Sequence, residues 1–327
     1  MNVTWQTALE KIQADVKHVE ATLARRCTSR VQVVDQVNRH TLGAGGKRLR
    51  PAFLILSAKA TGYPVELDRT VELAACMEIV HMATLIHDDV IDHSDSRRGR
   101  PTAAAVFGNT AAILAGDVLL AKSMQILAED GDLDIIRKVS AMVVEMAEGE
   151  AREVETRGDF DLSFEAHMEV LRMKTAAFVE CCCEVGGLAA RAPKLVTDAL
   201  ASYGHHLGLA FQLVDDVLDF RGDPATTGKP NATDFREGCA TLPLIDLREH
   251  LTEEELDFTR NRFGAHPSDD EVHMICGWME TRGCYTRALA AAGRHSAMAL
   301  GALDALPDGE TKDLLVAIVD FVQQRER

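Results

Sequence analysis

Stretches in which apolar and polar residues alternate, the pattern of half-buried strands, are nearly absent from this chain of 327 residues. Ala, Leu, Glu and Met are plentiful instead, and apolar residues recur at helical spacing. Long linkers, low-complexity segments and short-period repeats are also lacking. The sequence therefore predicts an all-α fold in a single domain over residues 1–327, with residues 1–35 as an N-terminal helical segment.

The chain also has no excess of positive charge, since its formal net charge is −16. A field of that sign disfavours nucleic acid and anionic membrane surfaces as primary partners. The eight cysteines include the run Cys181, Cys182 and Cys183 but no Cys-x-x-Cys pair and no zinc-type spacing. The N-terminus lacks the apolar core of a signal peptide. We therefore expect reduced thiols and a cytoplasmic protein.

Glycine and proline divide the helical pattern into segments. The predicted helices cover roughly residues 51–60, 68–93, 102–128, 132–156, 163–191, 194–220, 243–263, 268–281 and 282–326. The most apolar stretch, Ala103 to Ala128, contains Asn109, Asp117 and Lys122. These polar residues predict a buried helix rather than a transmembrane segment.

Two acidic clusters of the form D-D-x-x-D end two of these predicted helices: Asp88-Asp89-Val90-Ile91-Asp92 and Asp215-Asp216-Val217-Leu218-Asp219. Helical residues at i and i+4 share a face, so Asp88 and Asp92 repel each other unless a cation lies between them. The free carbonyls at a helix C-terminus also favour cations. The carboxylates of two such clusters facing one another would suit Mg²⁺, which bridges carboxylates to phosphate oxygens. The alternative is two unrelated acidic helix ends.

Basic residues lie close to these clusters in a protein of strongly negative charge. The residues concerned are Lys47, Arg50, Arg97, Arg98, Lys174 and Lys229. For any one of them a surface salt bridge is the simpler interpretation, but together they favour phosphate recognition.

The motifs occur in the order seen in trans-isoprenyl diphosphate synthases. They are Gly45-Gly46-Lys47-Arg48-Leu49-Arg50-Pro51, His81 with the first cluster and Arg97-Arg98-Gly99, Lys174-Thr175, and Phe211-Gln212 with the second cluster. From about residue 35 onward the chain resembles a chain-elongating polyprenyl synthase of the medium- or long-chain type, such as the octaprenyl diphosphate synthases. The resemblance implies an isoprenoid-synthase-type helical bundle around a central cavity, and a homodimer.

The resemblance also implies roles for the matching residues. Asp88, Asp92 and Asp215 would ligate three Mg²⁺ ions, with Asp89, Asp216 and Asp219 in support. The diphosphate of an allylic substrate, farnesyl or geranyl diphosphate, would be held by Arg97, Lys174, Thr175, Gln212 and Lys229. The diphosphate of isopentenyl diphosphate would be held by Lys47, Arg50, His81 and Arg98. The residues that carry the catalytic step would be Asp88, Asp92, Asp215, Lys174 and Arg97.

The mechanism implied by the resemblance is ionisation followed by condensation. Mg²⁺ and the Lys and Arg donors would stabilise charge on the departing diphosphate. No side-chain base is evident, so the proton would pass to the released diphosphate. Cys239 departs from the family pattern, since many relatives have lysine there. A non-catalytic subunit of a hetero-oligomeric synthase is therefore an alternative, although all the metal-binding aspartates are present.

Product length depends on the residues that precede the first cluster. A bulky aromatic residue there closes the elongation pocket in this family, whereas this chain has Ala83 and Thr84, with Val80 and Met77 next on that wall. The Glu148-Gly149-Glu150 motif also resembles the medium- and long-chain enzymes. We expect a product longer than C20, in the range C30–C50, of the kind used for quinone side chains.

Three alternatives stay open at this point. Ala83 could be small only for helix packing. A short-chain farnesyl or geranylgeranyl diphosphate synthase could have its pocket floor at Ser123 or Met124. A terpene cyclase shares the fold, but the intact second cluster together with Lys47 and Arg50 argues against it.

Overall fold

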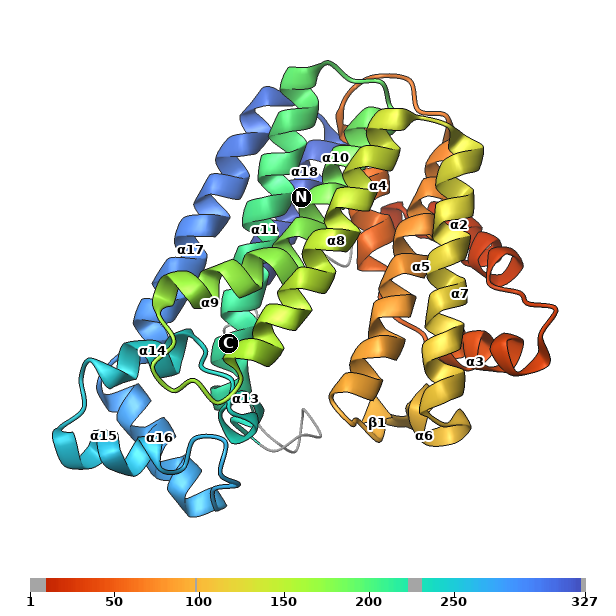
Figure 1. The fold of residues 1–327 in the computed structure, drawn as a ribbon. Helices are drawn as coiled ribbons and strands as arrows, with labels where there is room; N and C mark the ends of the chain where they lie inside the picture. The colour runs from red at the N-terminus through yellow and green to blue at the C-terminus, as the bar shows by residue number, and fades with distance from the viewer. Residues whose placement is uncertain (1–9, 98, 223–230, 325–327) are drawn as a thin grey trace. The chain divides into compact units, whose positions relative to one another are not determined.

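The computed structural model describes residues 10–97, 99–222 and 231–324 and confirms the all-α prediction (Figure 1). The only strands among these residues are β1 (Ser96–Arg97) and β2 (Arg100–Pro101). They form one antiparallel pair in which Arg97 lies opposite Arg100. Arg98 and Lys229, both predicted to bind diphosphate, lie outside the described residues.

The chain divides into two compact units, each assembled from segments far apart in the sequence. Unit 1 comprises Met1–Val143, Cys181–Ala201 and Ala305–Ala317, and unit 2 comprises Val144–Glu180, Ser202–Asp304 and Ile318–Arg327. The boundaries fall within or beside the helices α8 (Leu133–Thr156), α10 (Ala177–Ala189), α11 (Lys194–Arg221) and α18 (Glu310–Gln324). Compactness within each unit does not decide the number of domains, so the single domain stays a prediction.

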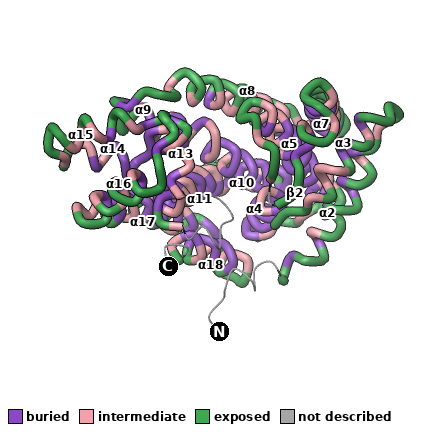
Figure 2. The backbone as a smooth tube through the Cα atoms, turned by 90° about the horizontal axis from the view of Figure 1, so that it is seen from below, coloured by how far each residue is buried: buried purple, intermediate pink, exposed green. Residues whose placement is uncertain are grey.

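Unit 1 is built around the long helix α5 (Leu67–Ile91). Three helices pack against it: α2 (Gln13–Arg26), α4 (Leu49–Ala60) and α7 (Asn109–Asp130). A further helix, α3 (Gln32–Gly43), packs against α7. Because α5 is contacted on several sides, it is buried over most of its length, as Figure 2 shows. The first acidic cluster is thereby placed at the end of a firmly packed helix.

The predicted helix over residues 102–128 is two helices, α6 (Ala103–Phe107) and α7. They separate at Gly108, whose φ of 82° lies in the region that favours glycine. The expectation that this stretch is buried was wrong in part, because apolar side chains of α7 such as Ile113, Leu114 and Met124 are exposed. By length and composition α5 and α7 could each cross a membrane; 72% of the apolar window is buried in α5 and 39% in α7.

Unit 2 contains a continuous helical run and a group of shorter helices. The run consists of α9 (Phe164–Leu171), the π-helical segment η1 (Arg172–Ala176) and the first part of α10, as predicted for residues 163–191. The shorter helices are α13 (Thr233–Glu237), α14 (Leu242–Arg248), α15 (Glu253–Arg260), α16 (Asp269–Thr281) and α17 (Cys284–Ala302), followed by η2 (Leu303–Ala305). The predicted helix over 243–263 divides because Thr252 and Glu255 form a capping box that begins α15.

Glycines allow helix backbones in unit 2 to approach closely. A Cβ atom at Gly204 of α11 would lie 2.6 Å from the carbonyl oxygen of Val179 and 2.8 Å from Cα of Glu180. Both neighbours are backbone atoms of α10, which no rotamer change can move aside. The packing of α11 against α10 therefore depends on the absence of a side chain at Gly204.

We predict that Gly204→Ala lowers the free energy of unfolding by about 1–3 kcal/mol, since an added methyl group overpacks the contact. The matched control is Gly293→Ala in α17, where a Cβ would meet nothing within 4 Å. The control should raise stability by about 0.5–1 kcal/mol, because alanine loses less backbone entropy in a helix. Urea unfolding at fixed protein concentration measures both, and equal effects at the two glycines would contradict the packing argument.

Candidate active site

The first acidic cluster lies where α5 ends. Asp92 is the C-cap residue, and its backbone N–H donates to the carbonyl of Asp88 at 2.8 Å. The Asp88 side chain is half-buried and that of Asp92 is exposed. Carboxylates at the carbonyl end of a helix add negative charge where the helix dipole is already negative. This position favours a bound cation.

One face of α5 is accessible at its C-terminal end. His81, Thr84 and Asp88 are half-buried and Asp92 is exposed, whereas Ala83 is buried. A helix turns by about 100° per residue, so positions 81, 84, 88 and 92 lie near one face. His81 is therefore on the same accessible face as the two outer aspartates.

The middle residue of the cluster, Asp89, is buried, with 6% of its surface exposed. Its Oδ1 accepts a hydrogen bond from Nε of Arg97 at 2.7 Å. Arg97 stands in β1 and its side chain is 38% exposed. The hairpin of β1 and β2 thus places the Arg97 guanidinium at the end of α5, where it pairs with the buried Asp89 carboxylate.

The four residues expected to set product length differ in their surroundings. Met77, Val80 and Ala83 are buried in unit 1. Thr84 is half-buried, and its hydroxyl donates to the carbonyl of His81 at 2.9 Å. Of the four, Thr84 is the residue on the accessible face of α5.

The loop that carries Lys47 and Arg50 is held by Arg48, which the sequence did not single out. Arg48 has a left-handed φ of 50° and precedes the first residue of α4. Its guanidinium is buried and donates from Nη1 to Oε1 of Glu78 on α5 at 2.8 Å. Lys47 is exposed and Arg50 half-buried on either side of this anchor.

The second acidic cluster lies at the end of α11, within unit 2. Asp215 and Asp219 are half-buried, whereas the middle residue, Asp216, is only 2% exposed. Its Oδ2 lies 2.9 Å from Nε2 of His167, which is on α9. Its Oδ1 accepts from Nε2 of Gln212 at 3.4 Å. The sequence predicts a diphosphate-binding role for Gln212 but no role for His167.

Asp219 accepts two hydrogen bonds from the backbone of α13. Its Oδ1 accepts the backbone N–H of Thr233 at 3.2 Å, and its Oδ2 accepts that of Asp234 at 3.1 Å. Both donors belong to the first turn of α13. Burial, with Asp219 and Asp216 nearby, raises the pKa of the Asp234 carboxyl well above its ordinary value. Asp219 therefore fixes the start of α13 as well as belonging to the acidic cluster.

Lys174, in the π-helical segment η1, is held between two glutamates of α8. Its Nζ lies 2.8 Å from Oε2 of Glu150 and 2.7 Å from Oε1 of Glu153. Burial opposes the charged ammonium, but Glu153 and Glu150 outweigh it and raise the pKa of Lys174 above its usual value. Two carboxylates around one ammonium leave this cluster with a net negative charge.

Gly149 accounts for the close approach of α8 to Lys174. A Cβ atom at this glycine would lie 2.6 Å from Cβ of Met173 and 3.1 Å from the backbone nitrogen of Lys174. Next to Lys174 in η1, the hydroxyl of Thr175 donates to Oε1 of Gln212, which is on α11, at 3.2 Å. The predicted Lys174, Thr175 and Gln212 are therefore brought together within unit 2.

Cys239 is half-buried, with Glu153 and Asp234 close enough to act on it electrostatically. Burial, with Glu153 and Asp234 nearby, raises the pKa of its thiol to about 12. The side chain is therefore neutral at physiological pH, as the lack of a lysine at this position had implied.

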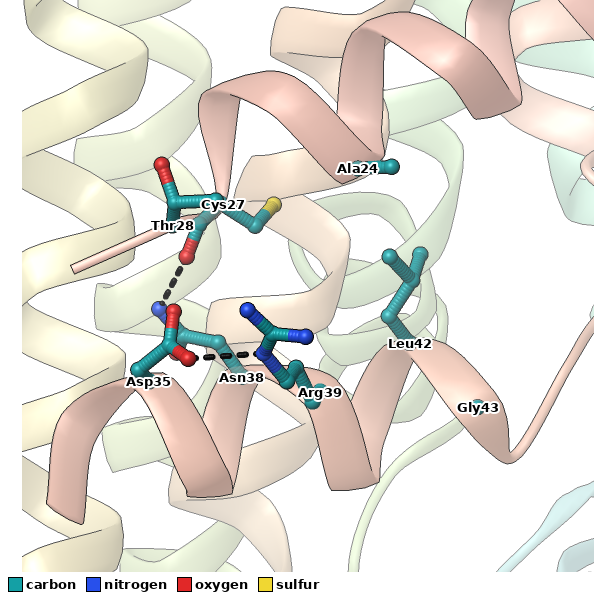
Figure 3. A pocket seen from close by; sticks show the side chains of 8 residues that line it. All are labelled: Ala24, Cys27, Thr28, Asp35, Asn38, Arg39, Leu42 and Gly43. Atoms are coloured by element: carbon teal, nitrogen blue, oxygen red, sulfur yellow. Dashed lines mark hydrogen bonds and ion pairs between the residues drawn. The ribbon is translucent and has the colours of Figure 1, made fainter. Parts of the chain in front are cut away.

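A pocket with a volume of about 310 Å³ lies between α2 and α3 of unit 1 (Figure 3). Asn38 donates to the carbonyl of Cys27 at 2.7 Å beside it, and Nε of Arg39 donates to Asp35 at 2.7 Å. Its lining includes none of the residues predicted to bind substrate or metal.

The comparisons with known proteins agree with one another. The sequence matches the polyprenyl synthetase family over residues 31–277. It is 36% identical to the octaprenyl diphosphate synthase of Escherichia coli K12 over 329 residues, covering 98% of this chain and 99% of that protein. The solved decaprenyl diphosphate synthase of Rhodobacter capsulatus is 34% identical with a TM-score of 0.93, covering 99% of each chain.

A third similar protein was solved with ligands. It is the polyprenyl synthase of Caulobacter crescentus CB15, complexed with calcium and isoprenyl diphosphate. It is 30% identical to this chain with a TM-score of 0.92, and the match covers 100% of this chain and 99% of that one.

We predict that Glu153→Gln strengthens binding of inorganic diphosphate about three- to tenfold, because it removes a negative charge beside the Lys174 ammonium. Glu150 remains to hold the lysine in place. Glu155→Gln is the control, since Glu155 is an exposed residue of the same helix. Isothermal titration calorimetry measures the affinities, and unchanged or weaker binding by Glu153→Gln would contradict the electrostatic argument.

Proposed function

We propose that this chain condenses isopentenyl diphosphate head-to-tail (1'-4) with an allylic diphosphate. The chain belongs to the polyprenyl synthetase family and is a chain-elongating prenyltransferase with a long product. The allylic substrate is farnesyl or geranyl diphosphate, and the product has C30–C50, as used for quinone side chains. The observation that carries the proposal is the accessible face of α5, which bears His81, Asp88 and Asp92 together.

Magnesium fits the donors that the two clusters offer. Asp88, Asp92 and Asp215 present carboxylate oxygens from the ends of two helices. Among the described residues no three His, Cys, Asp or Glu side chains gather to hold a metal by themselves. Mg²⁺ suits such a partial set, because it takes water and substrate phosphate oxygens for the rest of its shell. The calcium in the Caulobacter crescentus structure is likewise an oxygen-seeking cation.

Within the proposed mechanism, Asp88, Asp92 and Asp215 would hold three Mg²⁺ ions, and these would supply Lewis-acid stabilisation of the allylic diphosphate. Arg97 and Lys174 add fixed positive charge where the leaving oxygen becomes negative. Thr175, Gln212 and Lys229 hold the same diphosphate. The diphosphate of isopentenyl diphosphate is held by Lys47, Arg50, His81 and Arg98. The released diphosphate takes the proton, since no other base is assigned.

The supporting aspartates have a physical role in this proposal. Asp89 is partnered by Arg97, Asp216 by His167, and Asp219 by the backbone of α13. The carboxylates assigned to the metal are Asp88, Asp92 and Asp215, which are more accessible than the buried Asp89 and Asp216.

A homodimer and a cytoplasmic location complete the proposal. The exposed apolar residues Ile113, Leu114 and Met124 of α7 are suited to contact with a second copy of the chain. All eight cysteines are free thiols, which fits a reducing compartment.

The short-chain alternative is not favoured, since the relatives described above are named for octaprenyl and decaprenyl products. Met124, which would have closed a short pocket, is exposed.

Asp88→Ala is expected to lower kcat at least about a thousandfold, because the stabilisation of the leaving diphosphate is lost. Asp68→Ala, at the exposed N-terminal end of the same helix, is the control and should retain turnover. Steady-state assays with isopentenyl diphosphate, farnesyl diphosphate and Mg²⁺ measure both variants. Turnover of Asp88→Ala close to that of the unmodified enzyme would exclude the proposed site.

Thr84→Phe should shorten the product, because the ring would fill space on the accessible face of α5. Ala83→Phe should shorten it too, but at a cost of about 1–3 kcal/mol in stability, since Ala83 is fully buried. Thr84→Val keeps the volume and removes only the hydroxyl, so it should leave the product unchanged. Chromatographic sizing decides, and a product of Thr84→Phe as long as that of Thr84→Val would refute the pocket assignment.

A further inference from the structure

A buried pair of side chains, His167 and Asp216, lies beside the second acidic cluster. His167 is 4% exposed and Asp216 is 2% exposed. The imidazole Nε2 and the carboxylate Oδ2 are 2.9 Å apart, a hydrogen bond in which Nε2–H donates. A carboxylate removed from water needs such donors, so Asp216 depends on His167 for its place in the core of unit 2.

The other carboxylate oxygen of Asp216 is also engaged. Oδ1 accepts from Nε2 of Gln212 at 3.4 Å, and Oε1 of Gln212 accepts from the hydroxyl of Thr175 at 3.2 Å. The amide orientation of Gln212 follows from these two bonds. Both oxygens of Asp216 are thus engaged within the protein, and the neighbouring Asp215 is the more accessible of the two carboxylates.

The network joins α9 to α11 and, through the continuation of α9, to η1; the last two carry the predicted diphosphate-binding residues Lys174, Thr175 and Gln212. His167 is on α9, which continues directly into η1 with Lys174 and Thr175. Asp216 and Gln212 are on α11. The hydrogen bond of His167 therefore fixes η1 and the acidic end of α11 relative to each other within one unit.

We propose that His167 is a positioning residue of the second acidic cluster. Its Nε2–H holds the Asp216 carboxylate, and this contact sets the orientation in which α11 presents Asp215 to the metal-bridged diphosphate. His167 itself touches neither substrate nor metal. The inference rests on the proposed function, because it takes Asp215 as a metal ligand.

The test compares His167→Met with His167→Gln. The two replacements have unbranched side chains of similar length, but only glutamine places an N–H near the position of the imidazole Nε2. Mg²⁺ is titrated calorimetrically into each variant in the presence of inorganic diphosphate. The Mg²⁺ dependence of turnover is measured in parallel.

His167→Met should weaken Mg²⁺ binding about 10- to 100-fold, the usual effect of losing a partner behind a metal ligand. His167→Gln should stay within about threefold of the unmodified protein, because its amide restores the donor. In an Asp216→Asn background, His167→Met should cause no further loss, since the two side chains act through one contact.

The control is His205→Met in the same unit. His205 also bonds a carboxylate at 2.9 Å, from Nδ1 to Oε2 of Glu180, but it belongs to no part of the network around Asp216. It should leave Mg²⁺ binding unchanged.

The inference is overturned if His167→Met leaves Mg²⁺ binding unaltered, if methionine and glutamine weaken it equally, or if the losses in His167→Met and Asp216→Asn multiply. Asp215→Ala separates this inference from the proposed function. Loss of Mg²⁺ binding in Asp215→Ala with normal binding in His167→Met rejects only the role of His167. Normal binding and turnover in Asp215→Ala reject the proposed function itself.

Discussion

Repulsion between neighbouring carboxylates is the constraint on which the rest of this structure depends. Each acidic cluster places three aspartates within about one helical turn, at the end of the helix where the dipole is also unfavourable to anions. The protein meets this constraint in the same way twice. Asp89 is buried against Arg97 and Asp216 against His167, while Asp88, Asp92 and Asp215 are more accessible and are the residues that we propose as cation ligands. In our proposal, bound metal ions would supply the positive charge that each helix end lacks.

The same balance governs the basic residues of the site. Lys174 is held by Glu150 and Glu153, so its ammonium is positioned before an anion arrives but is also neutralised. In our proposal, a substrate diphosphate competes with these carboxylates for the Lys174 ammonium, and bound metal ions would help it to do so. Cys239, whose thiol is neutral, contributes no charge here. We therefore expect this arrangement to favour a metal-complexed diphosphate over a free one.

Features that depend on local sequence could be predicted, and features that depend on distant partners could not. The long helices followed from their periodicity, and the accessible face of α5 follows from the spacing of His81, Asp88 and Asp92. His167 carries no signal of its own, because its partner is 49 residues away and a lone histidine on a helix is most often an ordinary core residue. The anchoring role of Arg48 likewise depends on a distant partner, Glu78, which the local sequence of the loop does not reveal. The break at Gly108 could have been predicted, since a glycine inside a helical pattern often ends a helix.

The central claim is that this chain alone extends an allylic diphosphate into a long product through its aspartate clusters. The most direct measurement is incubation of the purified chain with labelled isopentenyl diphosphate, farnesyl diphosphate and Mg²⁺, followed by chromatographic sizing of the product. The account predicts Mg²⁺-dependent incorporation into products longer than C20, within C30–C50. Absence of incorporation, or a product that stops at C20 or below, would contradict it.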